Sequence, residues 1–136
     1  YAEKGYDLVV AVGYLMTSKL ARVAPRYPDT WFLLIDGQLD LPNVRCYAFR
    51  EEEGCFLVGA LAALKSETRT LGFVGGMKIP LIQKFFAGFV QGARHVRPDI
   101  EILSAYAGSF KDPVTGKAKA RLQIESGADV VFYRID

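Results

Sequence analysis

The chain has 136 residues, of which 51% are apolar and 24% are charged, and its formal net charge is +2 at pH 7. This composition is typical of a folded globular chain and excludes a largely disordered one. The lysines and arginines form no basic run or stripe among nearly as many acids, so nucleic acid is not expected as a partner.

The sequence contains no predicted membrane span, because its longest apolar stretch, residues 55–64, is shorter than the roughly 18 to 20 residues that a spanning helix needs. Its first residues lack the order of a signal peptide, so we expect either a cytoplasmic protein or a missing first segment. Cys46 and Cys55 are too few for a disulfide framework and have no CxxC spacing. Two small buried side chains are favoured over a functional thiol, and a bridge between them stays open.

The first half of the chain predicts three strands and two helices. Residues 7–13 form a short apolar run that ends in glycine, as in a parallel strand buried on both faces. Residues 15–24 have helical spacing of apolar positions, and strands are predicted at 31–36 and 43–49. Residues 51–65 predict a helix that is apolar on nearly every face, so we expect it to be buried on more than one side.

The second half repeats the alternation of strand and helix. An apolar strand at 70–76 ends in glycines, and a helix with an apolar stripe follows to about residue 96. Residues 100–108 predict a strand, a helix starts near Pro113, and residues 128–135 predict a final strand. Alternation of this kind predicts parallel sheets with crossover helices, which is a doubly wound α/β architecture.

The two ends of the chain predict flanking elements that are missing from it. The chain begins on what resembles a helix tail with Gly5 as its C-cap, and it ends on a strand with nothing to cover it. We therefore expect the fold to be truncated at both ends.

Ligands of open parallel sheets bind beyond the carboxyl ends of the strands. Four positions satisfy that rule, and they are Gly13-Tyr14, Asp36-Gly37, Gly75-Gly76-Met77 and Gly108-Ser109-Phe110. The glycines favour ordinary turns over a phosphate cradle, since the chain has no GxGxxG and no GxxxxGK[ST]. Asp36 either contacts a ligand or caps its own Asp-Gly turn, and both interpretations stay open. Phe110 is either a hydrophobic plug or a stacking surface, and its polar context favours stacking.

Catalysis has little support in the sequence. His95 is the only histidine, which removes Ser-His and Cys-His relays and any multi-histidine metal site. Glu51, Glu52 and Glu53 are consecutive, so a helix fans them apart, and we interpret them as a solvated first turn. We therefore predict no catalytic residue, no metal site, no cofactor and no enzymatic activity.

Three long strings, in this order along the chain, resemble signatures of the basic membrane protein family of PnrA-like lipoproteins. They are YPDTWFLLIDG with the downstream PNVRCYAFREEEGCFLVGALAALKS, then LGFVGGMKIPLIQKFFAGFVQGAR, then YAGSFKDPVTGKAKA. The resemblance implies a type I periplasmic binding protein fold with two α/β lobes around a cleft. It places part of the first lobe at residues 1–68 and the start of the second at residues 69–136.

The resemblance also implies a function. It indicates an extracytoplasmic solute-binding component of an ABC uptake system, which binds a purine nucleoside and delivers it to a permease. Asp36 matches an acidic ligand-binding position and Phe110 an aromatic that stacks on the base, with Tyr14, Gly76, Met77 and Lys84 as weaker candidates. The family's lipid-anchoring cysteine, which would be the only link to the membrane, lies in a segment absent from this chain.

Three alternatives remain beside this hypothesis. The same fold could bind a sugar-like ligand, an autoinducer or a peptide. A regulatory member of the family could sense a ligand without transport. A nucleotide-using enzyme of α/β fold is the least favoured, because the sequence lacks nucleotide-loop motifs.

Overall fold

The chain folds into two compact units that divide after Phe49. The computed structural model describes residues 1–134. The division differs from the sequence-based boundary at residues 68 and 69 by one helix, α2 (Glu51–Lys65), which belongs to the second unit. The physical reason is a close contact between α2 and a helix of the second unit, described below.

The first unit, residues 1–49, is built on one parallel sheet. Its strands are β1 (Leu8–Val12), β2 (Trp31–Ile35) and β3 (Val44–Tyr47), in the order β1-β2-β3. Its helical elements are η1 (Ala2–Lys4), η2 (Tyr14–Met16), α1 (Thr17–Val23) and η3 (Ala24–Arg26). All pairings are parallel, with Val10 opposite Leu33 and Leu34 opposite Cys46. The predicted strands and helix are therefore confirmed for this half of the chain.

One face of the first sheet is covered and the other is open within the described residues. Leu20 and Ala24 pack on the covered face against a core of strand side chains, namely Ala11, Phe32, Leu34 and Val44. On the opposite face, Leu8, Val10 and Val12 are 54, 52 and 63% exposed. The prediction that β1 is buried on both faces is wrong for this chain, because successive side chains of a strand point to opposite faces and residues 1–49 supply helices to only one.

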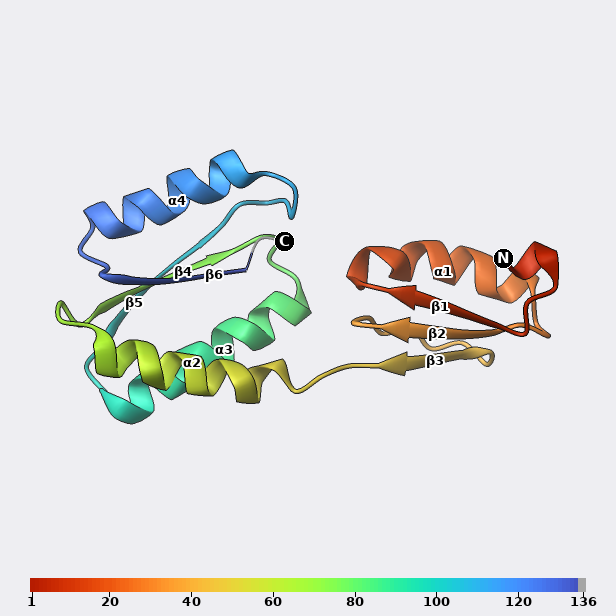
Figure 1. Cartoon of the computed structure of the whole chain (residues 1–136), viewed down its shortest axis with the longest axis horizontal. Helices are drawn as coiled ribbons and strands as arrows, with labels where there is room; N and C mark the ends of the chain where they lie inside the picture. Colours follow the sequence, from red (N-terminus) through yellow and green to blue (C-terminus); the bar gives the residue numbers. More distant parts are fainter. Residues whose placement is uncertain (135–136) are drawn as a thin grey trace. The chain divides into compact units, whose positions relative to one another are not determined.

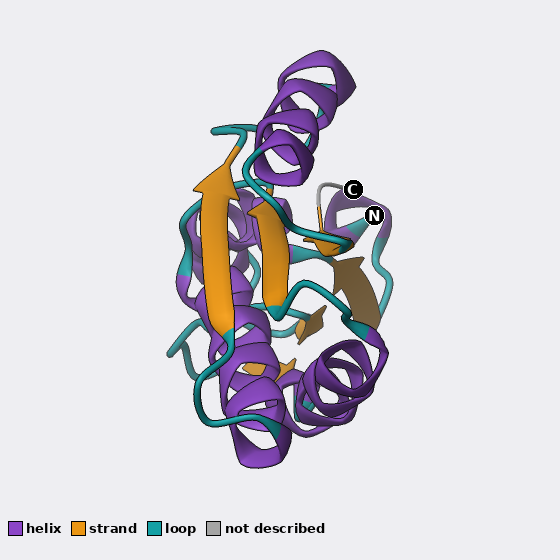
Figure 2. Ribbon diagram, turned by 90° about the vertical axis from the view of Figure 1, so that its left-hand side faces the viewer, coloured by secondary structure: helices purple, strands orange, loops and turns teal. Residues whose placement is uncertain are grey.

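The second unit is a sheet between two helical layers. β4 (Thr70–Gly75) lies in the centre, between β5 (Glu101–Tyr106) and β6 (Val130–Arg134), and both of its pairings are parallel. The helices α2 and α3 (Pro80–Val96) cover one face, and α4 (Pro113–Glu125) covers the other (Figures 1 and 2). The predicted doubly wound α/β architecture is confirmed. The predicted end of β6, Ile135, lies outside the described residues.

The core of the second unit is centred on β4, in which every residue is buried. Leu71, Phe73 and Phe89 are completely buried, and the Phe73 ring lies 4.9 Å from that of Phe86. On the α4 side, the buried Gln123 Nε2 donates to the Phe73 carbonyl oxygen at 2.9 Å. The strand predicted at 70–76 is thus the buried central strand that its unbroken apolar run indicated.

Small residues bring α2 and α3 into direct backbone contact. A Cβ atom added to Gly59 would collide with the Phe89 carbonyl oxygen, and one added to Gly92 would collide with that of Phe56. Gly88 faces Glu52 of α2 in the same way. Because no side chain separates the two backbones here, α2 is fixed to the second unit.

The outer face of α2 carries large side chains instead. Leu57, Leu61 and Leu64 are 70, 57 and 61% exposed, whereas its inner face consists of Cys55, Gly59, Ala62 and Ala63. The expectation that this helix is buried on more than one side is wrong within the described chain. Among residues 1–134, no helix has both the length and the apolar character to cross a membrane.

Asp129 joins the turn after α2 to the start of β6. Its carboxylate accepts hydrogen bonds from Ser66 Oγ at 2.7 Å and from the backbone N–H groups of Glu67 and Thr68 at 2.6 and 3.0 Å. These bonds, first of all that from the Thr68 backbone, hold the pKa of the Asp129 carboxyl well below its usual range.

The glycine contact predicts opposite effects at two positions of the helical layer. Gly92→Ala should lower the free energy of unfolding by about 1–3 kcal/mol, because the new methyl group forces α2 and α3 apart. Gly54→Ala is the matched control, since nothing lies within 4 Å of its added Cβ, and it should raise that free energy by roughly 0.5–1 kcal/mol. Urea unfolding measures both values, and an equal effect of the two substitutions would contradict the close crossing.

Asp129 predicts a pH dependence of stability. The pKa of the Asp129 carboxyl is lower in the folded chain than in the unfolded chain. Its contribution to stability is therefore complete at pH values above the unfolded-state pKa of about 3.9, and it is lost as the pH falls through the folded-state pKa. Asp129→Asn should therefore destabilise the chain at pH 7, and its difference from wild type should shrink below about pH 4.

The control for this experiment is Asp99→Asn, which breaks an exposed ion pair with Arg69 and should cost much less. Thermal unfolding at several pH values measures both variants. A deficit of Asp129→Asn that persists unchanged at acid pH would contradict the assignment.

Candidate functional site

Each sheet has one edge where the carboxyl ends of its strands meet, because all strands of a sheet run parallel. In such sheets this edge is where ligands bind. We describe the two edges separately, since they belong to different units.

The edge of the first unit carries Tyr14 and Asp36. The Gly13 N–H donates to the Ile35 carbonyl oxygen at 2.8 Å, and the Asp36 N–H donates to that of Tyr47 at 2.9 Å. These bonds extend the sheet by one residue beyond β1 and β2. Tyr14 follows at the start of η2 and is 39% exposed.

Asp36 has an unusual backbone and an unused carboxylate. Its φ is 61°, in the left-handed region that residues other than glycine rarely occupy, although Asp tolerates it better than most. Its half-buried side chain has no hydrogen bond or ion pair with any residue of the described chain. A turn cap through its own backbone is therefore absent, and the carboxylate remains available as an acceptor.

Gly37, next to Asp36, lies in a closely packed position. A Cβ atom at Gly37 would lie 2.7 Å from both Leu34 Cδ2 and Thr17 Oγ1, so no larger residue fits between β2 and the start of α1. A left-handed backbone such as that of Asp36 costs on the order of 1–3 kcal/mol, and strain of this kind is concentrated at functional sites.

The edge of the second unit is made by backbone groups around Gly76. The Gly76 N–H donates to the Arg134 carbonyl oxygen at 2.7 Å, and the Gly108 N–H donates to that of Gly76 at 2.7 Å. A Cβ atom at Gly76 would lie 2.5 Å from the Phe110 ring. Gly76 is therefore required for close packing of this ring, and its N–H is not free to bind a phosphate.

Phe110 is half-buried, with its ring against Gly76 and the hydrophobic core of the second unit. The loop that carries it is fixed on its far side by Asp112, which caps α4 by accepting from the Thr115 N–H at 2.9 Å and from Thr115 Oγ1 at 2.7 Å. The Thr115 backbone bond is the main reason why the pKa of the Asp112 carboxyl is lowered. Phe110 thus fills a gap in the core and still exposes part of its ring.

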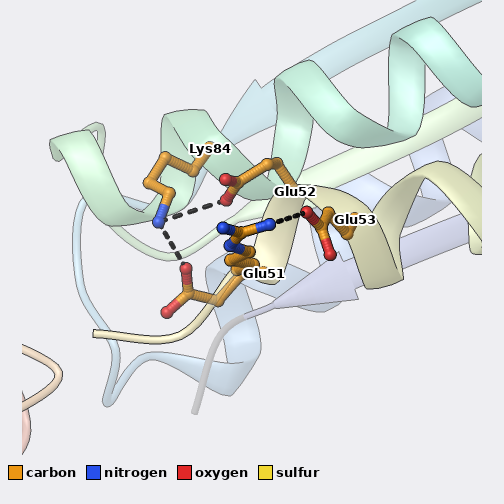
Figure 3. A network of polar contacts seen from close by, with 5 residues as sticks. Glu51, Glu52, Glu53 and Lys84 are labelled. Atoms are coloured by element: carbon orange, nitrogen blue, oxygen red, sulfur yellow. Dashed lines mark hydrogen bonds and ion pairs between the residues drawn. The ribbon is translucent and has the colours of Figure 1, made fainter. Parts of the chain in front are cut away.

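Besides Gly76, the two other weaker candidates of this unit differ in their surroundings. Met77 is half-buried and packs against the core, as a structural residue would. Lys84, on α3, contacts the first turn of α2: its Nζ lies 2.7 Å from Glu51 Oε2 and 3.1 Å from Glu52 Oε2 (Figure 3).

The prediction of a solvated first turn is correct for Glu53 but wrong for Glu51. Glu53 is 63% exposed and pairs with Arg50, whereas the Glu51 side chain is only 9% exposed. The hydrogen bond to Glu51 is the main cause that raises the pKa of Lys84. The sequence shows no sign of this pair, because its two residues lie 33 positions apart on different helices.

The two cysteines are free and lie in different units. Cys55 is buried, and burial followed by the nearby Glu51 charge raises the pKa of its thiol to about 11, so it stays protonated at neutral pH. His95 lies near the end of α3 with its ring 5.5 Å from that of Phe56. Within residues 1–134, no three side chains of the His, Cys, Asp and Glu types gather as metal ligands would.

The structure thus brings Phe110 into contact with Gly76 at one strand-end edge and places Tyr14 with Asp36 at the other. The edge of the second unit offers an aromatic face, and the edge of the first unit offers an unpaired carboxylate.

Comparison with known proteins agrees with the fold. Residues 1–136 match the family described as ABC transporter substrate-binding protein PnrA-like. The chain is 35% identical over 131 residues to the ABC transporter nucleoside-binding protein BmpA of Lactococcus lactis, covering 96% of this chain and 37% of that protein. It is 36% identical over 134 residues to basic membrane protein B of Borreliella burgdorferi, covering 95% of this chain and 39% of that protein.

A solved structure supports the same relationship. The solute-binding protein of an ABC transporter system from Aeropyrum pernix superposes with a TM-score of 0.85 at 35% identity, covering 98% of this chain and 40% of that one. The chain spans about two fifths of the length of these relatives. The resemblance predicted from the sequence is confirmed, and the chain belongs to the PnrA-like family of ABC transporter substrate-binding proteins.

Proposed function

We propose that this chain is part of an extracytoplasmic receptor that binds a purine nucleoside and delivers it to an ABC permease. The observation that carries the proposal is the Phe110 ring, held half-exposed against Gly76 at the carboxyl edge of a parallel sheet. A relative with 35% identity is a nucleoside-binding protein by name, which supports this ligand class. Membrane attachment would come from a lipid anchor outside residues 1–136.

Each of the two principal residues has a chemical role in this proposal. The Phe110 ring stacks on the base, an interaction worth about 1–3 kcal/mol per base in nucleic-acid systems. The Asp36 carboxylate accepts charge-assisted hydrogen bonds from N–H or O–H groups of the ligand. Because Asp36 has no partner in the described chain, binding breaks no existing bond of its side chain.

Phe110 substitutions separate stacking from simple filling of the core. The experiment uses the longest natural protein that contains residues 1–136. Phe110→Leu keeps an apolar side chain but loses the aromatic face, so it should weaken nucleoside binding by roughly 5- to 150-fold. Asp36→Asn should weaken binding by at least about 10-fold, because the acceptor loses its charge. Isothermal titration calorimetry with adenosine, guanosine and inosine measures these affinities.

The matched control is Val114→Ala, at a position on α4 that is 78% exposed, and it should leave the affinity unchanged. Wild-type protein that gives no heat with any of the three nucleosides would contradict the nucleoside assignment. Tight binding of a sugar or a peptide in their place would redirect it to that ligand class.

A further inference from the structure

Glu51 holds a carboxylate oxygen that nothing in the fold uses. Its side chain is 9% exposed and its Oε2 accepts from Lys84 Nζ at 2.7 Å, but its Oε1 is buried without a hydrogen-bond partner among residues 1–134. Leaving a buried acceptor unsatisfied is destabilising, and each such group in a folded protein needs an explanation.

Helix packing alone does not explain this burial. Glu52, on the same turn and 43% exposed, already gives Lys84 an ion-pair partner at 3.1 Å, so α2 and α3 could be joined without Glu51. The neighbouring Cys55 thiol does not supply a partner either, since Glu51 Oε1 accepts no hydrogen bond from any described residue. The buried carboxylate is therefore available for a further interaction.

The position of Glu51 relative to Phe110 indicates which part of a ligand it would meet. Phe110 follows β5 and packs on Gly76 at the end of the central strand. Glu51 lies towards the opposite flank, that of β6. Its charge and that of Arg134, a residue of β6, both act on the pKa of Cys55. In addition, its partner Lys84 directly precedes Phe85, and the Arg134 guanidinium lies over the Phe85 ring at 5.4 Å. A ligand whose base stacks on Phe110 would thus extend its sugar towards Glu51.

We propose that Glu51 is a ligand-binding residue that recognises a sugar hydroxyl, with Lys84 as the residue that positions it. The hydroxyl donates a hydrogen bond to Glu51 Oε1, and the Lys84 ammonium holds Oε2 at 2.7 Å. Oε1 is shielded from solvent, so water does not compete with a hydroxyl that donates to it. This inference rests on the proposed nucleoside-binding function.

The test compares ribonucleosides with their 2′-deoxy and 3′-deoxy analogues, by calorimetry on the longest natural chain that contains residues 1–136. Wild type should bind at least one deoxy analogue about 10-fold or more weakly than the ribonucleoside, since a hydrogen bond to a charged group is lost. Glu51→Gln should reduce this ratio to within about 3-fold. The control Glu53→Gln, two residues away and exposed, should keep the wild-type ratio.

Further measurements keep the result independent of folding. Lys84→Arg preserves the ion pair and should retain the discrimination. If Glu51→Gln does not fold, Glu51→Asp replaces it, and this shorter carboxylate should also reduce the ratio. Wild type that binds no nucleoside would overturn the proposed function, and this inference with it. Nucleoside binding with equal affinity for ribo and deoxy forms, or with a wild-type ratio in folded Glu51→Gln, would overturn this inference alone.

Discussion

Parallel pairing within each sheet is the constraint on which the other features depend. Because β1, β2 and β3 run in one direction, the residues that follow them, among them Tyr14 and Asp36, are collected at a single edge. The same constraint on β4, β5 and β6 collects Gly76 and the loop that ends at Phe110. Groups distant in the sequence thus lie at the same edge of a sheet without any direct attraction between them, and this is how parallel strands create a site.

The backbone contact between α2 and α3 adds a second constraint. Gly59 and Gly92 allow the helices to touch, and this contact assigns α2 to the second unit directly after the division at Phe49. As a result, the first turn of α2 reaches Lys84, and Glu51 becomes buried where a solvated glutamate would be expected. Packing of small residues along one helix contact thus determines the environment of a carboxylate in the first turn of α2.

Local patterns were sufficient to predict most of the fold and the position of the candidate site. The unbroken apolar run at 70–76 predicted a central strand, and the rule for strand ends selected Asp36 and Phe110 before any family was considered. Local patterns failed where distant packing decides the outcome. They could not reveal that Gly92 faces Phe56, that Lys84 pairs with Glu51, or that Val10 stays exposed, since each depends on an element far away in the sequence.

The central claim is that a ligand is bound where parallel strands end, with the Phe110 ring as its stacking surface. A crystal structure of the longest natural chain that contains residues 1–136, grown with inosine, tests it most directly. One inosine molecule should be bound with its base against the Phe110 ring. An inosine bound away from this ring, or no bound inosine at saturating concentration, would contradict the claim.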